Sequence, residues 1–312
     1  MARRARRRSA EPPGPSGFVV VDKPAGWTSH DVVDAARGWF GTRRVGHLGT
    51  LDPLATGVLP LALRSATKLI SFVPDREKGY EGAIRLGVET DTLDAEGRVL
   101  RRHDGPFPDE AQVREAMQGF VGEIEQVPPM FSAVKKGGVP LHKLAREGLE
   151  VEREPKTVQI DRFELRKFHP PLLDIEVRCS GGTYVRTLAA DLGTRLGCGA
   201  HLADLRRTRS GPFTLAQAIA PATLQEEAEA GTVERRLLSP LAVLGLPALR
   251  LEAHEIEAIA HGSEIASGGP AEPPGTRMLG HDGQGQVVAV LELQPGRRLR
   301  PLRVLEPFAG RR

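Results

Sequence analysis

Apolar residues along this chain of 312 residues recur with two spacings, and each spacing predicts one type of element. A spacing of two places alternate side chains on one face of a strand. It runs through residues 80–88 and 173–179, and the apolar segments 18–21 and 158–168 also predict strands. The predicted strands alternate with segments of helical spacing, so both element types share the chain.

Helical spacing, with apolar residues three and four apart, marks one buried helix face. It occurs in residues 32–40, 113–120, 185–196 and 254–260. Ser29 and Thr183 are expected to cap the first and third of these helices, and Asp109 to open the second. Gly41 and Gly197 are expected to end the first and the third.

The pattern changes from about residue 247. After the last predicted helix, short apolar segments at residues 286–293 and 299–305 lie around a turn formed by Asp282 and Gly283. We expect a small β-rich unit here. On the pattern alone, this unit could bind a ligand or only pack against the rest of the chain.

Composition allows a large folded domain and a small one. Glycine and proline number 35 and 25, below the share of roughly 25–30% that is typical of low-complexity chains. The net charge is only +3, yet arginines gather at residues 3–8, 206–209 and 297–303. One such cluster is often only a solvated face, but three favour a polyanionic partner such as nucleic acid.

The remaining composition excludes several classes. The two cysteines, Cys179 and Cys198, give no disulfide framework and no metal-ligand spacing, so we expect no metal site. Residues 1–16 are rich in Arg, Pro, Gly and Ser and are expected to be a disordered basic arm. The apolar run that follows is too short for a signal peptide, and no segment could span a membrane. We expect a cytoplasmic protein.

Residues 46–60, GHLGTLDPLATGVLP, interrupt both spacings. Proline and glycine exclude a continuous helix, so the segment is expected to be a shaped loop that leads into a buried strand. Asp52 is the only acid in it. From the pattern alone, a turn or a cap is the commoner role for such an aspartate, and catalysis is the alternative.

This segment closely resembles the catalytic signature of the pseudouridine synthases, specifically the TruB family of bacterial tRNA pseudouridine-55 synthases. Four further segments resemble motifs of that family: DKPAGWTSHDVV (22–33), KGY with LGVETDT (78–80 and 86–92), CSGGTYVRTLAADLG (179–193) and GCGAHLADLRR (197–207). The resemblance is close over residues 17–215 and loose over residues 247–310.

The resemblance implies roles for four residues. Asp52 would be the essential catalytic carboxylate, and Tyr80 would stack on the target base and is the candidate general base. Tyr184 would pack beneath the base, and Arg186 would pair with Asp52. Arg186 is also unusual on local grounds, because the macrodipole disfavours a cation in a first helical turn unless a carboxylate is near. Such a cation lowers an aspartate pKa by roughly 1–3 units and would keep Asp52 ionised.

Further residues carry weaker expectations from the same resemblance. Lys23 and Pro24 would support the floor of the site, and Leu205 would border the pocket. His47 would contact RNA near the flipped base, although a packed histidine or a general base are the alternatives. Asp91 matches an acid close to the active site.

Residues 127–148 are basic and rich in Gly and Pro. An ordinary surface excursion would explain this composition. In the family, however, this region is a mobile segment that closes over the T-arm of tRNA. The expected phosphate contacts are Lys135, Lys136, His142, Lys143 and Arg146.

The fold that the resemblance implies is α+β: a catalytic domain at residues 17–246, with a mixed central β-sheet and flanking helices, and a small β-rich PUA-like RNA-binding domain at residues 247–312. The implied reaction isomerises uridine 55 in the T-loop of tRNA to pseudouridine by base flipping, glycosidic bond cleavage, base rotation and C–C reattachment. It needs no cofactor, and the enzyme is expected to act as a monomer.

Two other functions are weighed against this one. The basic clusters permit an RNA-binding or tRNA-folding protein whose isomerase activity is secondary. A glycosidase with paired carboxylates would need a second acid beside Asp52, and the loop itself offers none.

Overall fold

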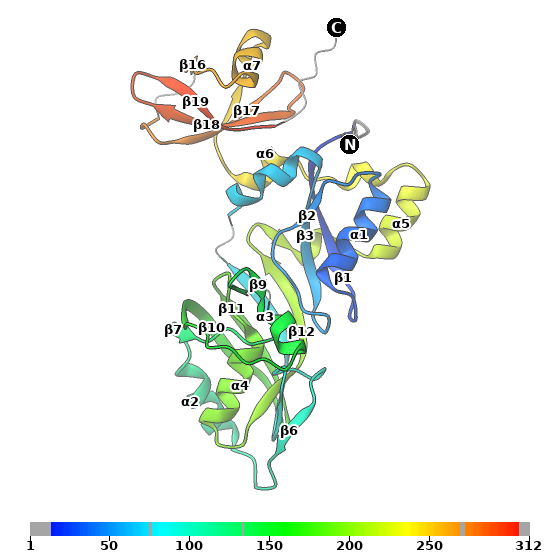
Figure 1. The fold of residues 1–312 in the computed structure, drawn as a ribbon, viewed down its shortest axis with the longest axis vertical. Helices are drawn as coiled ribbons and strands as arrows, with labels where there is room; N and C mark the ends of the chain where they lie inside the picture. Colours follow the sequence, from blue (N-terminus) through cyan, green and yellow to red (C-terminus); the bar gives the residue numbers. More distant parts are fainter. Residues whose placement is uncertain (1–13, 75–76, 133, 269–271, 306–312) are drawn as a thin grey trace, which may run out of the picture.

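The computed structural model describes residues 14–74, 77–132, 134–268 and 272–305. Figure 1 shows an elongated molecule, with a long central sheet and a smaller sheet at one end, beyond helix α6 (Pro240–Leu244). The expected basic arm lies mostly outside the described residues.

The large sheet has ten strands within the described residues. Eight follow the order β14-β1-β3-β12-β4-β11-β10-β7, while β13 pairs with β12 and β2 with β3. Their bounds are β1 (Gly17–Lys23), β2 (Val45–His47), β3 (Thr56–Leu63), β4 (Lys78–Leu86), β7 (Gly122–Gln126), β10 (Lys156–His169), β11 (Leu172–Cys179), β12 (Ala200–Ser210), β13 (Phe213–Thr214) and β14 (Ala218–Ile219). Strand β12 runs parallel to β3 and antiparallel to β4, so the sheet is mixed, as expected.

Helices cover one face of this sheet. The main apolar core joins strand residues such as Val19, Leu61 and Ile84 to the inner faces of four helices. These are α1 (Ser29–Trp39), α2 (Glu110–Gln118), α4 (Val185–Arg195) and α5 (Pro221–Glu229). The α+β class expected from the sequence is therefore confirmed.

A second apolar core lies on the opposite face of β1 and β3, because successive strand residues point to opposite faces. Phe18, Val20 and Val58 pack there with residues of the 3₁₀ helix η1 (Arg64–Phe72), α6 and the C-terminal sheet. Lys68 Nζ donates to the carbonyl of Val304 at 3.1 Å, so a polar bond also joins these parts.

The C-terminal sheet has the order β15-β17-β18-β19-β16. Its strands are β15 (Ala248–Arg250), β16 (Ile265–Ala266), β17 (Arg277–His281), β18 (Val287–Gln294) and β19 (Arg298–Val304). Helix α7 (Ala253–Ala260) packs on it through Ile259. The small β-rich unit predicted here is present.

Short elements complete the chain: β5 (Val88–Thr90), β6 (Val99–Arg102), β8 (Lys135–Lys136), β9 (Val139–Pro140), α3 (Leu141–Arg146), η2 (Leu215–Gln217) and η3 (Val233–Arg236). Within the described ranges, no helix combines the length and the apolar character that a membrane span requires.

The structure corrects two predicted caps. Thr28, not Ser29, is the N-cap of α1, where it accepts a hydrogen bond from the Asp31 amide. Ser29 is buried and bonds instead to the backbone of Leu51. Thr183 does not cap α4 either, because its hydroxyl donates to the carbonyl of Ser180.

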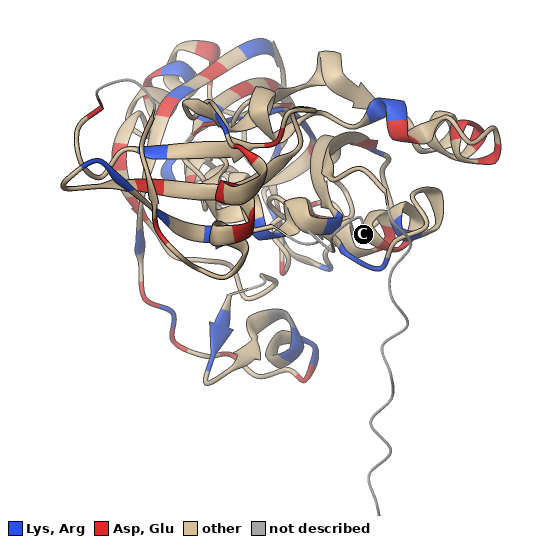
Figure 2. Cartoon of the chain, turned by 90° about the horizontal axis from the view of Figure 1, so that it is seen from above, with Lys and Arg blue, Asp and Glu red and all other residues tan. Residues whose placement is uncertain are grey.

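The arginines at residues 206–209 do not form an open basic patch. Arg207 is buried, Arg206 pairs with Asp22, and Arg209 pairs with Glu77. Figure 2 shows charged residues of both signs interspersed over much of the chain. The cluster is therefore divided: β12 is a central strand that turns Arg207 inward, while Arg206 and Arg209 stay partly exposed, each beside a carboxylate.

Candidate active site

A pocket of about 250 Å³ opens where the Asp52 loop meets β4, α4 and β12. Asp52, Tyr80, Tyr184, Arg186 and Leu205 all line it. The structure thus brings together the four residues given roles in the chemistry and Leu205, which was expected to border the pocket, although Asp52 and Leu205 are 153 positions apart (205 − 52).

Buried polar contacts fix the loop that carries Asp52. The ammonium of Lys23 donates to the carbonyls of Pro24, Trp27 and Pro53, at 2.9, 2.5 and 3.1 Å. Because Lys23 has no exposed surface, it cannot contact RNA directly. Its position fits the supporting role that the resemblance implies, and burial lowers the pKa of Lys23 to about 8.

This buried ammonium predicts a pH dependence of stability. An unfolded lysine titrates near its ordinary pKa of 10.5, whereas the folded value is about 8. Between these values the unfolded chain binds more protons, so the free energy of unfolding should rise with pH through this window and fall as pH decreases toward 8. Urea denaturation of wild type and Lys23→Met measures it: the variant should lose this part of the slope, and equal slopes would contradict the assignment.

Arg207 holds the same loop from the other side. Its guanidinium donates to the carbonyls of Gly49, Thr50 and Val58, at 3.1, 3.3 and 2.7 Å. The loop also requires glycine at position 57, which has φ +95° and where a Cβ would lie 2.3 Å from the carbonyl oxygen of Arg207. The sequence analysis missed this role, although an inward alternation of Leu205 and Arg207 was a signal for it.

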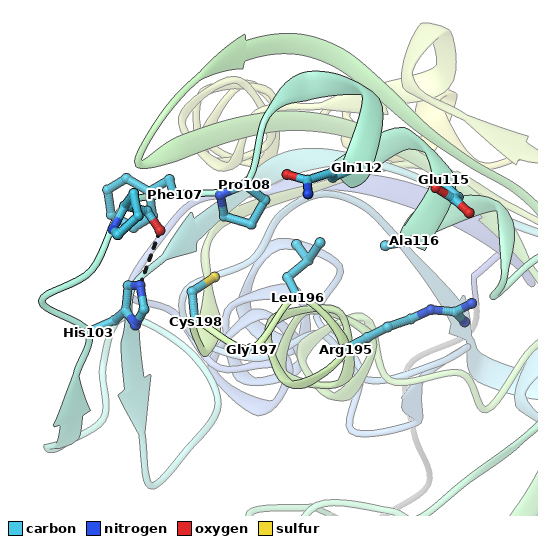
Figure 3. A pocket seen from close by; sticks show the side chains of 11 residues that line it. His103, Phe107, Pro108, Gln112, Glu115, Ala116, Arg195, Leu196, Gly197 and Cys198 are labelled. Atoms are coloured by element: carbon cyan, nitrogen blue, oxygen red, sulfur yellow. Dashed lines mark hydrogen bonds between the residues drawn. The ribbon is translucent and has the colours of Figure 1, made fainter.

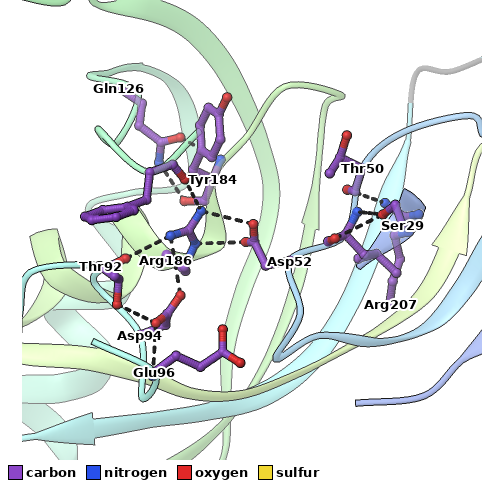
Figure 4. A network of polar contacts seen from close by, with 12 residues as sticks. Ser29, Thr50, Asp52, Thr92, Asp94, Glu96, Gln126, Tyr184, Arg186 and Arg207 are labelled. Atoms are coloured by element: carbon purple, nitrogen blue, oxygen red, sulfur yellow. Dashed lines mark hydrogen bonds and ion pairs between the residues drawn. The ribbon is translucent and has the colours of Figure 1, made fainter. Parts of the chain in front are cut away.

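An ion pair stands at the centre of the pocket (Figure 4). Arg186 Nε lies 2.8 Å from Asp52 Oδ2, and Arg186 Nη2 lies 3.1 Å from Asp52 Oδ1. The Arg186 side chain is only 4% exposed, while that of Asp52 is 36% exposed and opens to the pocket. The local conflict between a cation and a helix N-terminus is therefore resolved by a carboxylate, as expected.

Arg186 has three further partners. It donates to the carbonyl of Thr92 at 2.8 Å and to that of Phe131 at 2.9 Å, and it lies 3.4 Å from the carboxylate of Asp94. Its guanidinium is thus held by carboxylates from two loops and by the segment that begins at residue 127. Such a multiply bonded arginine has little freedom to leave Asp52.

Asp94, not Asp91, is the second acid of the site. Asp91 accepts a hydrogen bond from the Arg98 amide and stabilises its own turn. Asp94 is buried and accepts from the Thr92 hydroxyl and the Glu96 amide. Both acids stand in one short turn, and the sequence offered no way to choose between them.

The backbone at Leu93 helps to aim Asp94. Leu93 has φ +64°, a left-handed conformation that is unusual for a bulky residue. Its carbonyl accepts a hydrogen bond from the Leu202 amide of β12, at 3.0 Å. This bond ties the turn to the central sheet and offsets a local strain of roughly 1–3 kcal/mol.

The electrostatics of Asp52 differ from the expectation. Burial raises the pKa of Asp52 above its ordinary value, and the nearby carboxylate of Asp94 raises it further. The guanidinium of Arg186 acts in the opposite direction but does not outweigh burial. The ion pair therefore limits the rise of this pKa rather than bringing it below the ordinary range, as the sequence analysis expected.

Two tyrosines form walls of the pocket. Tyr80 is buried on β4, and burial raises its pKa to about 12, so the phenol is protonated at neutral pH. The backbone of Tyr184 is fixed by two hydrogen bonds with the Gln126 amide, at 2.7 and 3.1 Å. Leu205 adds an apolar surface. Aromatic and apolar walls suit a flat heterocycle.

His47 lies outside the pocket lining. It sits half-buried on β2, and burial lowers the pKa of its imidazole, so the neutral form dominates at neutral pH. Its strand pairs with β3, next to the loop that carries Asp52. Contact with an RNA that covers the pocket therefore stays a prediction.

The basic segment forms a small projecting unit. Lys135 and Lys136 lie exposed on β8, and Lys143 and Arg146 lie exposed on α3. His142 belongs to the same helix. The ammonium of Lys136 donates to the carbonyl of Glu152, in the segment that follows α3.

A larger cavity, of about 480 Å³, lies away from these residues (Figure 3). It is bordered by Phe107 and Pro108 on one side and by Arg195, Leu196 and Cys198 on the other. None of the residues expected to take part in chemistry lines it.

Comparison with known proteins gives concordant results. The model described as "TruB family pseudouridylate synthase (N terminal domain)" matches residues 37–185, and that described as "tRNA pseudouridylate synthase B C-terminal domain" matches residues 186–244. The chain is 45% identical to tRNA pseudouridine synthase B of Geobacter sulfurreducens over 92% of this chain and 99% of the relative. It is 43% identical to that of Pseudomonas aeruginosa over 93% and 96%.

Solved structures share the fold. The structure of an H/ACA RNP bound to a substrate RNA containing 2′-deoxyuridine is matched with a TM-score of 0.67 and 25% identity, over 93% of this chain and 85% of that one. A Cbf5-Nop10-Gar1 complex gives a TM-score of 0.67 and 27% identity over the same shares.

The fold and the matches together define the class of the protein as a pseudouridine synthase, an isomerase. The resemblance inferred from five sequence motifs is confirmed over most of the chain. The chain belongs to the TruB family of pseudouridine synthases.

Proposed function

We propose that the enzyme isomerises the uridine at position 55, in the T-loop of tRNA, to pseudouridine, acting as a monomer in the cytoplasm. The observation that carries the proposal is the Asp52–Arg186 ion pair in a pocket walled by Tyr80, Tyr184 and Leu205. The curated relatives bear the name tRNA pseudouridine synthase B, which supports tRNA as the substrate.

The reaction breaks the C1′–N1 bond of uridine, rotates the uracil and forms a C1′–C5 bond. Asp52 serves as nucleophile or as electrostatic partner of the sugar or base. Arg186 limits the rise that burial causes in the pKa of this carboxylate and holds it in position. No electrons or groups enter from outside, so the reaction requires no cofactor.

Tyr80 stacks on the detached uracil and prevents its escape during rotation. Its pKa of about 12 makes a free phenolate scarce at neutral pH, which favours stacking over proton removal as its main role. Tyr80→Phe should therefore keep most of the activity. A loss as large as that of an Asp52 variant would instead assign the final deprotonation to this hydroxyl.

The target uridine must leave its loop to enter this pocket. Flipping costs a few kcal/mol, and contacts with the RNA backbone offset that cost. The projecting segment 127–148 and the β-rich C-terminal unit, which we take to be PUA-like, would supply these contacts. Because phosphate contacts read shape rather than sequence, the T-arm alone should be recognised.

This proposal predicts that a minihelix containing only the T-stem and T-loop is converted at a rate close to that of full-length tRNA. Incubation of purified enzyme with radiolabelled minihelix, followed by nuclease digestion and nucleoside chromatography, measures conversion and its position. The matched control is a minihelix with cytidine at the target position. Reaction of full-length tRNA only, or pseudouridine at another position, would contradict the T-arm assignment.

The phosphate contacts make a separate prediction. Replacing Lys135, Lys143 or Arg146 with alanine should weaken RNA binding and reduce the slope of log affinity against log salt by about 1 per lost contact. Filter binding from 50 to 300 mM salt measures both quantities. Arg101→Ala on β6, which removes an exposed arginine paired with Glu89, is the control and should change neither.

A further inference from the structure

Two buried cations besides Arg186 line the catalytic pocket. Lys78 comes from β4 and is 5% exposed, and Arg207 comes from β12 and is 1% exposed. Removing a cation from water is costly, so a pocket that holds two such groups near its reactive carboxylate calls for a reason. Support of the loop that carries Asp52 explains in part why Arg207 is buried here. It does not explain why Lys78 and Arg207 are both placed on the pocket wall.

The two cations flank a single glycine. Gly49 has φ +102°, and a Cβ built on it would lie 3.6 Å from Arg207 Nη1 and 3.7 Å from Lys78 Nζ. The ammonium of Lys78 also donates to the hydroxyl of Ser210 at 2.8 Å, which fixes its position. Both positive charges are therefore held at one place on the pocket wall, beside the loop that carries Asp52.

The charge balance of Arg207 differs from that of Arg186. Arg186 contacts two carboxylates, those of Asp52 and Asp94. Arg207 donates to three neutral carbonyls, and no carboxylate of the described residues lies within ion-pair distance of it. Its positive charge is thus not neutralised by an acid, and it remains available to an anion that enters the pocket.

The proposed reaction creates such an anion. When the C1′–N1 bond breaks, its electron pair stays on the uracil, whether Asp52 bonds to C1′ or removes a sugar proton. If Asp52 adds to the ring instead, the ring again acquires the electron pair. The negative charge spreads over N1, O2 and O4 until C5 bonds to C1′, after which C5 loses its proton and N1 gains one. Atoms and electrons therefore balance without an outside reagent.

We propose that Lys78 and Arg207 stabilise the negative charge that develops on the uracil when its bond to the sugar breaks. This inference rests on the proposed function and deepens it by separating two tasks. The Asp52–Arg186 pair acts on the sugar side, and the Lys78–Arg207 pair acts on the leaving base. Fixed cations in a site that excludes water are the most effective form of such stabilisation.

The test compares two leaving groups in otherwise identical T-arm RNA: uridine and 5-fluorouridine at the target position. Fluorine withdraws electrons and stabilises the uracil anion, so this base leaves with less help from the protein. The measurement is the single-turnover rate at which the target nucleotide is consumed. Lys78→Met removes the charge at similar volume, and Lys78→Arg keeps the charge. Lys78→Gln replaces the methionine variant if that variant unfolds at a markedly lower temperature than the wild type.

Lys78→Met should slow consumption of uridine by roughly 10²-fold, the scale of losing one donor at a developing negative charge. It should slow 5-fluorouridine much less, leave RNA affinity unchanged, and be largely rescued in Lys78→Arg. Arg209→Met, which removes a half-exposed arginine of β12 paired with Glu77, is the control and should leave both rates unchanged.

Equal slowing of the two substrates would show a purely structural role for Lys78 and overturn the inference, as would unchanged rates for both. The wild-type rate on uridine reports on the proposed function by itself. The ratio of the uridine rate to the 5-fluorouridine rate in the Lys78 variants reports on the role of the cations. Failure of the proposed function and failure of this inference are therefore distinguishable.

Discussion

Replacing Asp52 with asparagine should lower the single-turnover rate of uridine isomerisation by roughly 10⁴-fold or more, the scale on which loss of a catalytic nucleophile acts. The amide keeps the size of the side chain and can still accept a hydrogen bond from Arg186. It lacks the negative charge, however, that every route through this pocket requires. Affinity for T-arm RNA should stay the same, because the substitution removes no contact with phosphate.

Single-turnover kinetics and filter binding on the same RNA separate these two quantities. Asp34→Asn is the matched control: Asp34 is an exposed aspartate of α1 that pairs with Arg37, and its loss should change neither rate nor affinity. Near-normal turnover of Asp52→Asn would defeat the catalytic assignment. Loss of RNA binding would favour a protein that acts mainly by holding tRNA.

Replacing Arg186 with methionine should have the second-largest effect, a loss of rate of roughly 10²–10³-fold, as for removal of a fixed charge partner in a catalytic site. Methionine fills the buried space but leaves the carboxylates of Asp52 and Asp94 without their shared cation. The carbonyls of Thr92 and Phe131 also lose their donor. Both geometry and charge of the site therefore change.

The same variant should alter the pH profile. The ionised form of Asp52 is the active one, so the rate falls as pH drops through its pKa. Burial already raises that pKa, and Arg186 is the largest influence in the opposite direction. Without the guanidinium the pKa rises further, and the acidic limb of the rate profile should move to higher pH.

Single-turnover rates from pH 5 to 9 measure the shift. Arg195→Met, at the far end of the same helix, is the control, because this arginine stacks on Phe120 away from the pocket. A slower enzyme with an unshifted acidic limb would mean that Arg186 acts through position alone.

Periodicity was sufficient for most of the fold. Strands β4 and β11 were predicted from strict alternation, and α1, α2 and α4 from helical spacing with glycines or aspartate at their ends. These signals are local, because a half-buried element carries its own apolar face in its sequence. Helix caps were less predictable, because Thr28 and Ser29 both suit an N-cap and only the buried bond of Ser29 to Leu51 distinguishes them.

Some contacts of the active site could likewise be predicted from local sequence, and others could not. The motif around Asp52 and the misplaced cation at Arg186 were visible in the sequence, and their contact was expected. The inward turn of Arg207 and the choice of Asp94 over Asp91 were not. Both depend on the register of β12, which pairs with β3 and β4 and anchors the Leu93 turn through Leu202. Register between distant strands is a property of the whole sheet, so a local alternation such as that of Leu205 and Arg207 indicates a shared face but not how that face is aligned with the neighbouring strands.

The apolar layer behind β1 and β3 bears on how the chain can be shortened. Phe18 and Val20 share this layer with Leu279 and Val290 of the C-terminal sheet and with Leu305, which follows β19. A minimal catalyst trimmed at residue 246 would expose this layer to water and favour its aggregation. Any such truncation would need polar substitutions on the uncovered strand face before its activity could be compared fairly with that of the intact enzyme.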